Sequence, residues 1–405
     1  MIACFACLTV ALPGLGQSFR VLHAFTGPEG RSPEGVLTLD QTGNLYGTTY
    51  YGGSVNGNCR NGCGTVFELI HRGSNWSIDN VHKFSARGEG AFPTAGVVFG
   101  PDGALYGTTS LAVLTGPNNQ DAGTVYKLVP SVCGTALCPW RYTVIHRFFS
   151  FAEGDNPTNG NVVFDHGGNL YGTLQYGGPA CIGDPCGLVY ELTPDGDSWL
   201  EKTIYSFTGG SDGNWPIAGV VFDSLGNLYG ETEYGGMGDQ GNAYELIPSP
   251  SGWTESTIYS FGPYPGGGLM IDRADNLYGT VCCDGAVFEL NFLNGDWMLN
   301  VLYSFGGPGY LTQAGPLVMD GDGNLYGTTT NGGTGGGNVY KLSPTAMGWI
   351  YTDIHDFHGP DGATPFSGVT LDASGNIFGT TAFGGDVTGC NPPAGCGVVW
   401  EIAKD

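Results

Sequence analysis

The chain of 405 residues contains few basic residues and few charged residues of any kind. It has 13 Lys and Arg against 37 Asp and Glu, a formal net charge of −24, and a charged fraction of 12%. Nucleic acids require cationic side chains that neutralise their phosphates, and anionic membrane surfaces have the same requirement. The composition therefore argues against a nucleic-acid partner and against an anionic membrane as the binding surface.

Long apolar segments are also lacking, and we expect no transmembrane segment. Residues 1–16 are apolar but too short to span a bilayer, and they end in Gly14-Leu15-Gly16, a small-x-small pattern typical of signal-peptidase sites. The alternative is a buried first strand. Because no repeat unit includes residues 1–16, we expect them to be a signal peptide and residues 17–405 to form one domain. The sequence thus predicts a secreted, extracellular or periplasmic protein.

Ten cysteines remain outside this leader, and they fall into five local pairs. The pairs are Cys59/Cys63, Cys133/Cys138, Cys181/Cys186, Cys282/Cys283 and Cys390/Cys396. Tight pairs in a secreted chain indicate disulfides that close loops. The neighbours Cys282 and Cys283 form either a strained bridge or two free thiols, because adjacent Cα atoms lie only about 3.8 Å apart. A zinc site needs four ligands, and no pair has a His or a second pair beside it, so we expect no metal and no cofactor.

Glycine, by contrast, is abundant (73 residues), and one glycine-containing motif occurs seven times. Its first copy is Gly43-Asn44-Leu45-Tyr46-Gly47-Thr48-Thr49. The aromatic residue of the motif recurs at positions 46, 106, 171, 229, 278, 326 and 378. Strand-forming repeats of about fifty residues are typical of β-propellers and solenoids.

Each repeat predicts four strands, here called a to d. Strand a is an apolar run that ends in Asp, as at residues 36–40, and strand b is the Leu-Tyr-Gly-Thr segment. Strand c follows a glycine-rich loop, as at residues 64–69, and strand d ends in a His or Tyr with a Phe two residues later, as at residues 81–84. Residues 19–25 resemble a d strand without its preceding strands, and residues 398–402 resemble a c strand without its d strand. A closed ring explains this permutation, whereas an open solenoid needs caps instead. We therefore predict an all-β, seven-bladed β-propeller with four-stranded antiparallel blades, closed by the N-terminal strand pairing with the last blade.

The repeat resembles a known family. Its Asp-x-x-Gly-Asn-Leu-Tyr-Gly-Thr-Thr segment, Gly-Gly loop and Gly-Thr-Val-Phe-Glu-Leu strand are similar to the GloVer tandem repeat of secreted bacterial proteins. The resemblance covers residues 19–402. It implies a propeller-type repeat and a secreted location, and it implies no particular activity.

Most polar repeat positions predict structural roles. The Asp that ends strand a is expected to accept backbone N–H groups of the following turn. His23, His82, His146 and His355 alternate with Tyr in strand d, which indicates a packing position. The Gly in the middle of strand b predicts the close approach of a neighbouring ring or backbone. The Glu of strand c, as at Glu68, is expected to be solvated or to lie between blades.

Candidate ligand residues lie in the d-to-a and b-to-c loops, which share the face that we call the top. In the d-to-a loops the residue before a Pro, expected to be extended, differs between blades. Blade five has the shortest loops, so a notch is expected there. The candidate ligand-binding residues are Phe92, Asp212, Trp215, Asp239, Tyr264, Asp284, Tyr310 and Phe366. Aromatic faces beside carboxylates suit a neutral sugar; the alternative is that these aromatics only pack the loops.

The sequence therefore favours a secreted, non-enzymatic binding protein whose top-face loops hold a glycan or a protein. It contains no Gly-x-Ser-x-Gly, P-loop or His-Glu-x-x-His motif. One alternative is a polysaccharide hydrolase or lyase that uses acidic top-loop residues such as Asp155, Asp212, Asp284 and Asp361. A third possibility is a structural repeat protein of the envelope or of an extracellular assembly.

Overall fold

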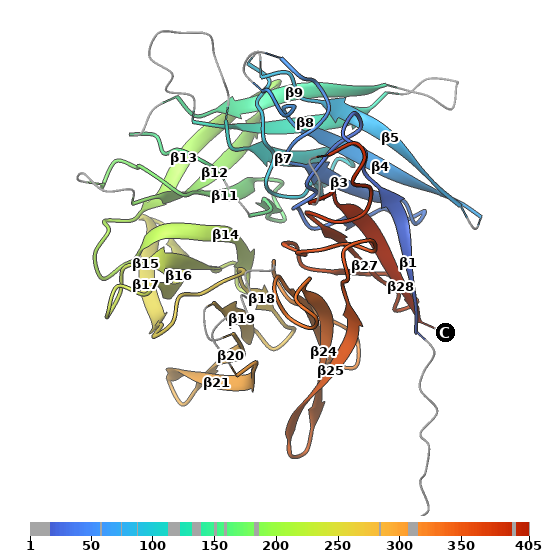
Figure 1. Ribbon diagram of the computed structural model, residues 1–405. Helices are drawn as coiled ribbons and strands as arrows, with labels where there is room; N and C mark the ends of the chain where they lie inside the picture. Colours follow the sequence, from blue (N-terminus) through green and yellow to red (C-terminus); the bar gives the residue numbers. More distant parts are fainter. Residues whose placement is uncertain are drawn as a thin grey trace, which may run out of the picture.

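The computed structural model describes residues 17–56, 59–73, 75–86, 88–111, 122–131, 139–149, 152–157, 160–181, 186–282, 285–306, 315–390 and 394–404. Within them the chain forms seven four-stranded antiparallel sheets and no helix. The sheets are arranged as blades around a common axis (Figure 1). This confirms the predicted seven-bladed β-propeller.

Each blade runs from a short inner strand to a long outer strand. The strands, from innermost to outermost, are in blade 1 β2 (Thr38–Leu39), β3 (Leu45–Thr49), β4 (Thr65–Arg72) and β5 (Asn75–Lys83); in blade 2 β6 (Val98–Phe99), β7 (Leu105–Thr109), β8 (Thr124–Pro130) and β9 (Trp140–Arg147); in blade 3 β10 (Val163–Phe164), β11 (Leu170–Leu174), β12 (Leu188–Asp195) and β13 (Ser198–Ser206); in blade 4 β14 (Asn214–Phe222), β15 (Leu228–Tyr234), β16 (Asn242–Ser249) and β17 (Gly252–Ser260); in blade 5 β18 (Met270–Ile271), β19 (Leu277–Val281), β20 (Ala286–Leu293) and β21 (Asp296–Ser304); in blade 6 β22 (Val318–Met319), β23 (Leu325–Thr329), β24 (Asn338–Thr345) and β25 (Gly348–Asp356); and in blade 7 β26 (Thr370–Leu371), β27 (Ile377–Thr381), β28 (Val398–Lys404) and β1 (Gln17–Ala24).

The N-terminal strand closes the ring, as predicted. Strand β1 pairs with β28 from Gln17 opposite Lys404 to Ala24 opposite Val398. The two strands lie side by side in blue and red in Figure 1. Phe19 on β1 also stacks on His355 of blade 6, with ring centroids 3.7 Å apart. The first strand thus completes the last blade and contacts the blade before it.

The core lies between adjacent blades, where strands b and c present large side chains. Strand b is buried along its whole length in blade 1, and Phe67 of strand c is fully buried. A Cβ atom on Gly47 would lie 2.6 Å from the Phe67 ring. The mid-strand Gly therefore makes room for a neighbouring ring, as predicted.

Hydrogen bonds confirm the turn role of the Asp that follows strand a. Asp40 Oδ1 accepts the N–H groups of Thr42 at 2.8 Å and Asn44 at 2.9 Å. The same acceptor geometry recurs at Asp165, Asp223, Asp272, Asp320 and Asp372. Partial burial alone would raise the pKa of Asp40, but these hydrogen bonds outweigh it and hold the pKa below its ordinary value.

The Glu of strand c differs from expectation. The hydroxyl of Tyr46 donates to Glu68 Oε1 at 2.8 Å within the same blade, because Tyr46 and Glu68 are cross-strand partners. Equivalent bonds join Tyr171 to Glu191 and Tyr229 to Glu245. The inter-blade alternative is wrong for these blades, since the Tyr of strand b supplies a donor within the same blade and leaves the carboxylate half-buried.

The strand-d histidines act as packing groups, as predicted. The ring of His82 stacks on Tyr142 of the next blade at 4.0 Å and meets Phe84 edge to face at 4.9 Å. Burial lowers the pKa of His82 to about 4, so the ring is neutral near pH 7.

Strand a is shorter than expected. Its ladder with strand b contains two residues in six blades, although the sequence predicts five, as at residues 36–40. The remaining inner residues contact the neighbouring blades instead: a Cβ atom on Gly35 would lie 2.6 Å from the Gly96 backbone nitrogen.

Candidate functional site

The d-to-a and b-to-c loops meet on one face of the propeller, which is the predicted top face. Isolated bridges join these loops within a blade, between Arg31 and Tyr51, between Ala91 and Leu111, and between Asp155 and Tyr176. In these blades the two kinds of loop are therefore adjacent to one another.

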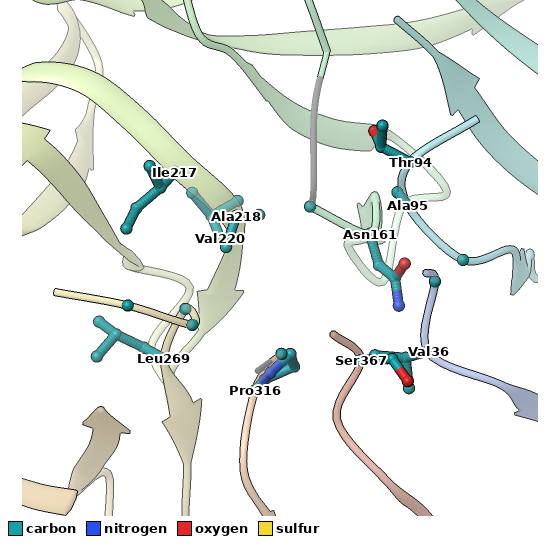
Figure 2. Close-up of a pocket in the computed structure, with 18 of the residues that line it drawn as sticks. Val36, Thr94, Ala95, Asn161, Ile217, Ala218, Val220, Leu269, Pro316 and Ser367 are labelled. Carbon is teal, nitrogen blue, oxygen red and sulfur yellow. The ribbon is translucent and has the colours of Figure 1, made fainter. Parts of the chain in front are cut away.

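A cavity of about 450 Å³ lies at the axis, and residues of all seven blades line it. Figure 2 shows Val36, Thr94, Asn161 and Ser367 on one side of the opening and Ile217, Ala218 and Leu269 on the other. Most of its wall is built from the residues that lead into each strand a. Small residues dominate there because adjacent inner segments touch: a Cβ atom on Gly315 would lie 2.5 Å from the Gly368 nitrogen.

Besides the hydroxyls of Thr94 and Ser367, four carboxyl or amide side chains line the cavity: Glu34, Asn161, Gln175 and Glu233. All four are half-buried. Burial raises the pKa of Glu34 to about 7, and burial also raises the pKa of Glu233. Among the described residues that line the cavity there is no Lys, Arg or His. The cavity therefore offers carboxyl and amide groups without a cation.

Apolar groups complete the lining. Val36, Ile217, Val220 and Leu269 contribute aliphatic surface, and Phe366 contributes an aromatic side chain that is 37% exposed. Phe366 is the predicted ligand residue that lines the cavity. A polar rim beside apolar surface is the usual composition of a small-molecule site.

Trp215 and Phe92 lie outside this lining, in strained positions of the d-to-a loops. Both precede a Pro, and both have left-handed backbones, with φ of 64° and 59°. Ser32, Asn156 and Thr364 take the same conformation at the equivalent positions. The expectation of an extended residue before Pro is therefore wrong at these five positions.

The physical reason is a contact between blades. Trp215 N–H donates to the carbonyl of Cys186 at 2.8 Å, and Phe92 N–H donates to that of Cys63 at 2.8 Å. Ser32 N–H donates in the same way to Cys396 at 2.9 Å. These bonds to the preceding blade outweigh the local preference of a residue before Pro.

The predicted acidic residues Asp212 and Asp239 organise their own loops. Asp212 accepts the Tyr205 hydroxyl at 3.0 Å and the Thr208 N–H at 2.8 Å. Asp239 accepts the Gly235 N–H at 2.9 Å. Their carboxylates are thus already engaged, although a role in ligand binding stays a prediction.

The other predicted residues have different surroundings. Tyr264 meets Tyr234 edge to face at 5.4 Å, and Asp361 accepts His355 Nε2 at 2.9 Å. Burial raises the pKa of Asp155. Tyr310 and Asp284 lie outside the described residues, so their roles and the notch expected at blade five stay predictions.

Three predicted disulfides are present. They join Cys59 to Cys63, Cys181 to Cys186 and Cys390 to Cys396, with Cα atoms 5.1, 5.4 and 5.4 Å apart. Cys133, Cys138 and Cys283 lie outside the described residues, so the other two pairs stay predictions. In each of these disulfides the second cysteine is the one whose backbone carbonyl accepts the N–H of the left-handed residue before Pro in the next blade.

The polar lining was missed by sequence reasoning, although part of it has a signal. Glu34 directly follows the Pro of its d-to-a loop, and Gln175 and Glu233 are four residues after the repeated aromatic residue. Both positions differ from blade to blade inside an otherwise constant repeat. Asn161 has no comparable signal.

In the part of the chain that the structure describes, no three His, Cys, Asp or Glu side chains are grouped so that they could hold a metal ion. No helix found there is long and apolar enough to cross a bilayer.

Comparisons with known proteins match the repeat and the fold. The family model of the Gloeobacter/Verrucomicrobia repeat matches residues 10–138, 61–283 and 184–391. No curated protein matches the chain. The chain is similar to virginiamycin B lyase from Staphylococcus aureus, with a TM-score of 0.57, 12% identity, and coverage of 96% of this chain and 99% of that one. It is also similar to a putative 6-phosphogluconolactonase from Bacteroides uniformis, with a TM-score of 0.50, 11% identity, and coverage of 81% and 84%. Identities this low indicate a shared fold alone.

Proposed function

The chain belongs to the Gloeobacter/Verrucomicrobia repeat family, and we propose that it is a non-enzymatic binding propeller that holds a neutral carbohydrate in its axial cavity. The observation that carries this proposal is the lining of that cavity. Side chains that depart from the repeat meet there, whereas the repeat keeps most other positions constant. Variable residues on a constant frame are typical of binding sites.

The size and chemistry of the cavity favour a small polyhydroxylated ligand. Its volume of about 450 Å³ lies in the usual range of ligand pockets. Near neutral pH a carboxyl group with a pKa of about 7, as at Glu34, is partly protonated, so it both donates and accepts hydrogen bonds. The Asn161 amide adds a donor and an acceptor. These groups match hydroxyls, and the aliphatic wall matches the apolar face of a sugar ring.

Charge argues against an anionic ligand. The described lining contains two carboxyl groups and no cation, and the whole chain has a formal charge of −24. An acidic sugar would be repelled, whereas a neutral sugar would not.

The disulfides support the same proposal. Three loop disulfides are typical of secreted or periplasmic proteins. We infer that the protein is secreted or periplasmic, where it would encounter extracellular glycans.

A glycan array followed by titration calorimetry tests this function. We expect residues 17–405 to retain one or more neutral glycans, and we expect Glu233→Gln and Asn161→Ala to weaken binding about tenfold or more. Asp197→Asn is the matched control, because Asp197 is an exposed carboxylate on the opposite face. Retention of no glycan, or equal affinity in the cavity variants, would contradict the proposal.

A hydrolase or lyase is the second candidate, and one observation favours it. Glu34 and Glu233 are two carboxyl groups with raised pKa values in one cavity, and a raised pKa suits a general acid. Incubation with each retained glycan separates the two functions. Release of products by the parent chain, abolished in Glu34→Gln, would replace the binding role with catalysis.

A further inference from the structure

Four aromatic rings form a continuous ladder across the top of blades 3 to 5. The ring centroids of Tyr176 and Trp215 are 5.3 Å apart, those of Trp215 and Tyr234 are 5.2 Å apart, and those of Tyr234 and Tyr264 are 5.4 Å apart. All four side chains are half-buried.

The ladder arises from two repeat positions that are both aromatic in blade 4. One position, at Tyr176 and Tyr234, lies at or just after the end of strand b, and the other directly precedes the Pro that leads into strand a. The first position in one blade packs against the second in the next blade, as Tyr176 packs on Trp215 and Tyr234 packs on Tyr264. Trp215 and Tyr234 then join the two contacts within blade 4.

Local packing does not require these aromatic rings. Ser32, Asn156 and Thr364 make the same left-handed turn and the same bond to the preceding blade as Trp215 does. A Trp with a φ of 64° is an unfavourable choice for the turn itself, since Gly and, among the other residues, Asn tolerate this region best. The side chain therefore needs another explanation.

The ladder adjoins the axial cavity. Gln175 and Glu233 line the cavity and directly precede Tyr176 and Tyr234, and Pro265, which directly follows Tyr264, also lines it. Three of the four rings are thus adjacent in the chain to the cavity wall. A ligand held in the cavity has the ladder beside it.

The charges beside the ladder are acidic. Within the described residues 152–157, 175–181, 207–219, 233–241 and 261–268 there is no Lys, Arg or His. Asp155, Glu233 and Asp239 lie in these segments. A second aromatic cluster, at Tyr50, Tyr51 and Phe92 in blades 1 and 2, differs because Arg31 lies over the Tyr51 ring at 5.5 Å.

We propose that the ladder extends the axial cavity into a platform for a linear, neutral glycan chain, with one end of the chain in the cavity and the following units against Tyr176, Trp215, Tyr234 and Tyr264. This inference rests on the proposed carbohydrate function and adds that the ligand is a linear chain of several sugar units. Sugar rings present apolar C–H faces to aromatic rings, while their hydroxyls reach the flanking carboxylates. An anionic glycan would be repelled by those carboxylates.

Oligosaccharides of increasing length test the proposal. The probes are the disaccharide and the hexasaccharide derived from cellulose, laminarin, xylan, starch and chitin. Each is titrated against residues 17–405. For the polysaccharide whose oligomers bind, we expect the hexasaccharide to bind about tenfold more tightly than the disaccharide. The ladder supplies this gain in affinity.

Trp215→Asn and Tyr234→Ala should abolish that gain and leave the affinity for the disaccharide unchanged. Asn is chosen at residue 215 because Asn156 already occupies the equivalent turn, so the variant should fold. Phe92→Asn is the matched control, since it makes the same change at the equivalent position outside the ladder, and it should keep the gain.

The possible failures are distinguishable. Equal affinity for short and long chains would overturn the ladder and leave the cavity function standing, whereas binding of no saccharide would overturn the proposed function itself. Tighter binding of chitosan oligomers or of a basic peptide than of any neutral chain would overturn the assignment of a neutral glycan. A gain that survives in Trp215→Asn and Tyr234→Ala would show that the rings only pack the loops.

Discussion

Glu231 of blade 4 accepts the backbone N–H of Gly268 in blade 5 through Oε2 at 3.0 Å. Other blades have Thr at this position, and its hydroxyl donates in the opposite sense, as from Thr48 to the Ala95 carbonyl at 2.8 Å and from Thr173 to the Ala218 carbonyl at 2.6 Å. The longer carboxyl side chain reaches the Gly-rich segment of blade 5, which lines the axial cavity. In this contact between blades the side chain therefore accepts a hydrogen bond from the backbone, whereas Thr48 and Thr173 donate one to it.

The pH dependence of stability is the first prediction. Glu231 is fully buried, and burial raises its pKa to about 8, above the ordinary value of about 4.3. Between these values the folded state binds a proton that the unfolded state does not, so the free energy of unfolding falls as pH rises. Each pKa unit corresponds to about 1.4 kcal/mol. Glu231→Gln should flatten this decline and be the more stable form at pH 8.

Denaturant titrations at pH 5 and pH 8 provide the measurement. The difference between the parent and Glu231→Gln isolates this residue from the other titrating groups, including Glu34, whose pKa is also raised. Parallel declines in both proteins would contradict the prediction.

The mid-strand Gly provides the second prediction. Gly47→Ala should destabilise the fold by about 1–3 kcal/mol, because the added methyl group would overlap the fully buried Phe67 ring. Gly321→Ala is the control: no heavy atom lies within 4 Å of its added Cβ atom, so the free energy of unfolding should change by less than about 0.5 kcal/mol. Similar losses in both variants, measured by urea unfolding, would show that the Phe67 contact is not the cause.

Disulfide removal is the third prediction. Cys181→Ser combined with Cys186→Ser should lower the melting temperature and weaken glycan binding, because the Cys186 carbonyl holds the strained N–H of Trp215. Loop closure contributes about 2 kcal/mol for so short a loop, less than for a long one, and the lost geometry adds to it. Removal of the Cys390–Cys396 bridge is the comparison. The Cys396 carbonyl accepts the N–H of Ser32, which lies in blade 1 and outside the ladder. This removal should lower the melting temperature with less effect on the affinity for long glycans. Equal effects on binding would contradict this assignment.

The architecture could be predicted because its signals are local and repeated. Seven copies of one motif set the blade count, and the orphan strand at residues 19–25 indicated how the ring closes. The Asp turns and the strand-b Gly were also predictable, since their partners lie in the same blade or directly beside it.

The axial cavity could not be predicted, because its lining is assembled only when the ring closes. Glu34, Asn161 and Glu233 belong to three different blades, and nothing in their neighbourhoods along the chain links them. The left-handed turns were missed for a related reason. The local preference of Trp215 before Pro216 was known, but its bond to Cys186 of the preceding blade outweighs that preference.

Ring closure provides the last prediction. Deleting residues 17–24 would expose the edge of β28, where Val399 and Trp400 pair with β1 and are fully buried in the intact chain. An unpaired edge promotes aggregation. We therefore expect the shortened chain to melt at a much lower temperature and to self-associate.

A permuted chain that begins at residue 25 and continues from Lys404 through Asn-Gly into residues 17–24 should restore stability, because Gln17 lies opposite Lys404 and a two-residue hairpin fits that register. Circular dichroism melts and size-exclusion chromatography of the three chains provide the measurement. A shortened chain as stable as the parent, or a permuted chain that does not fold, would contradict closure of the ring by β1.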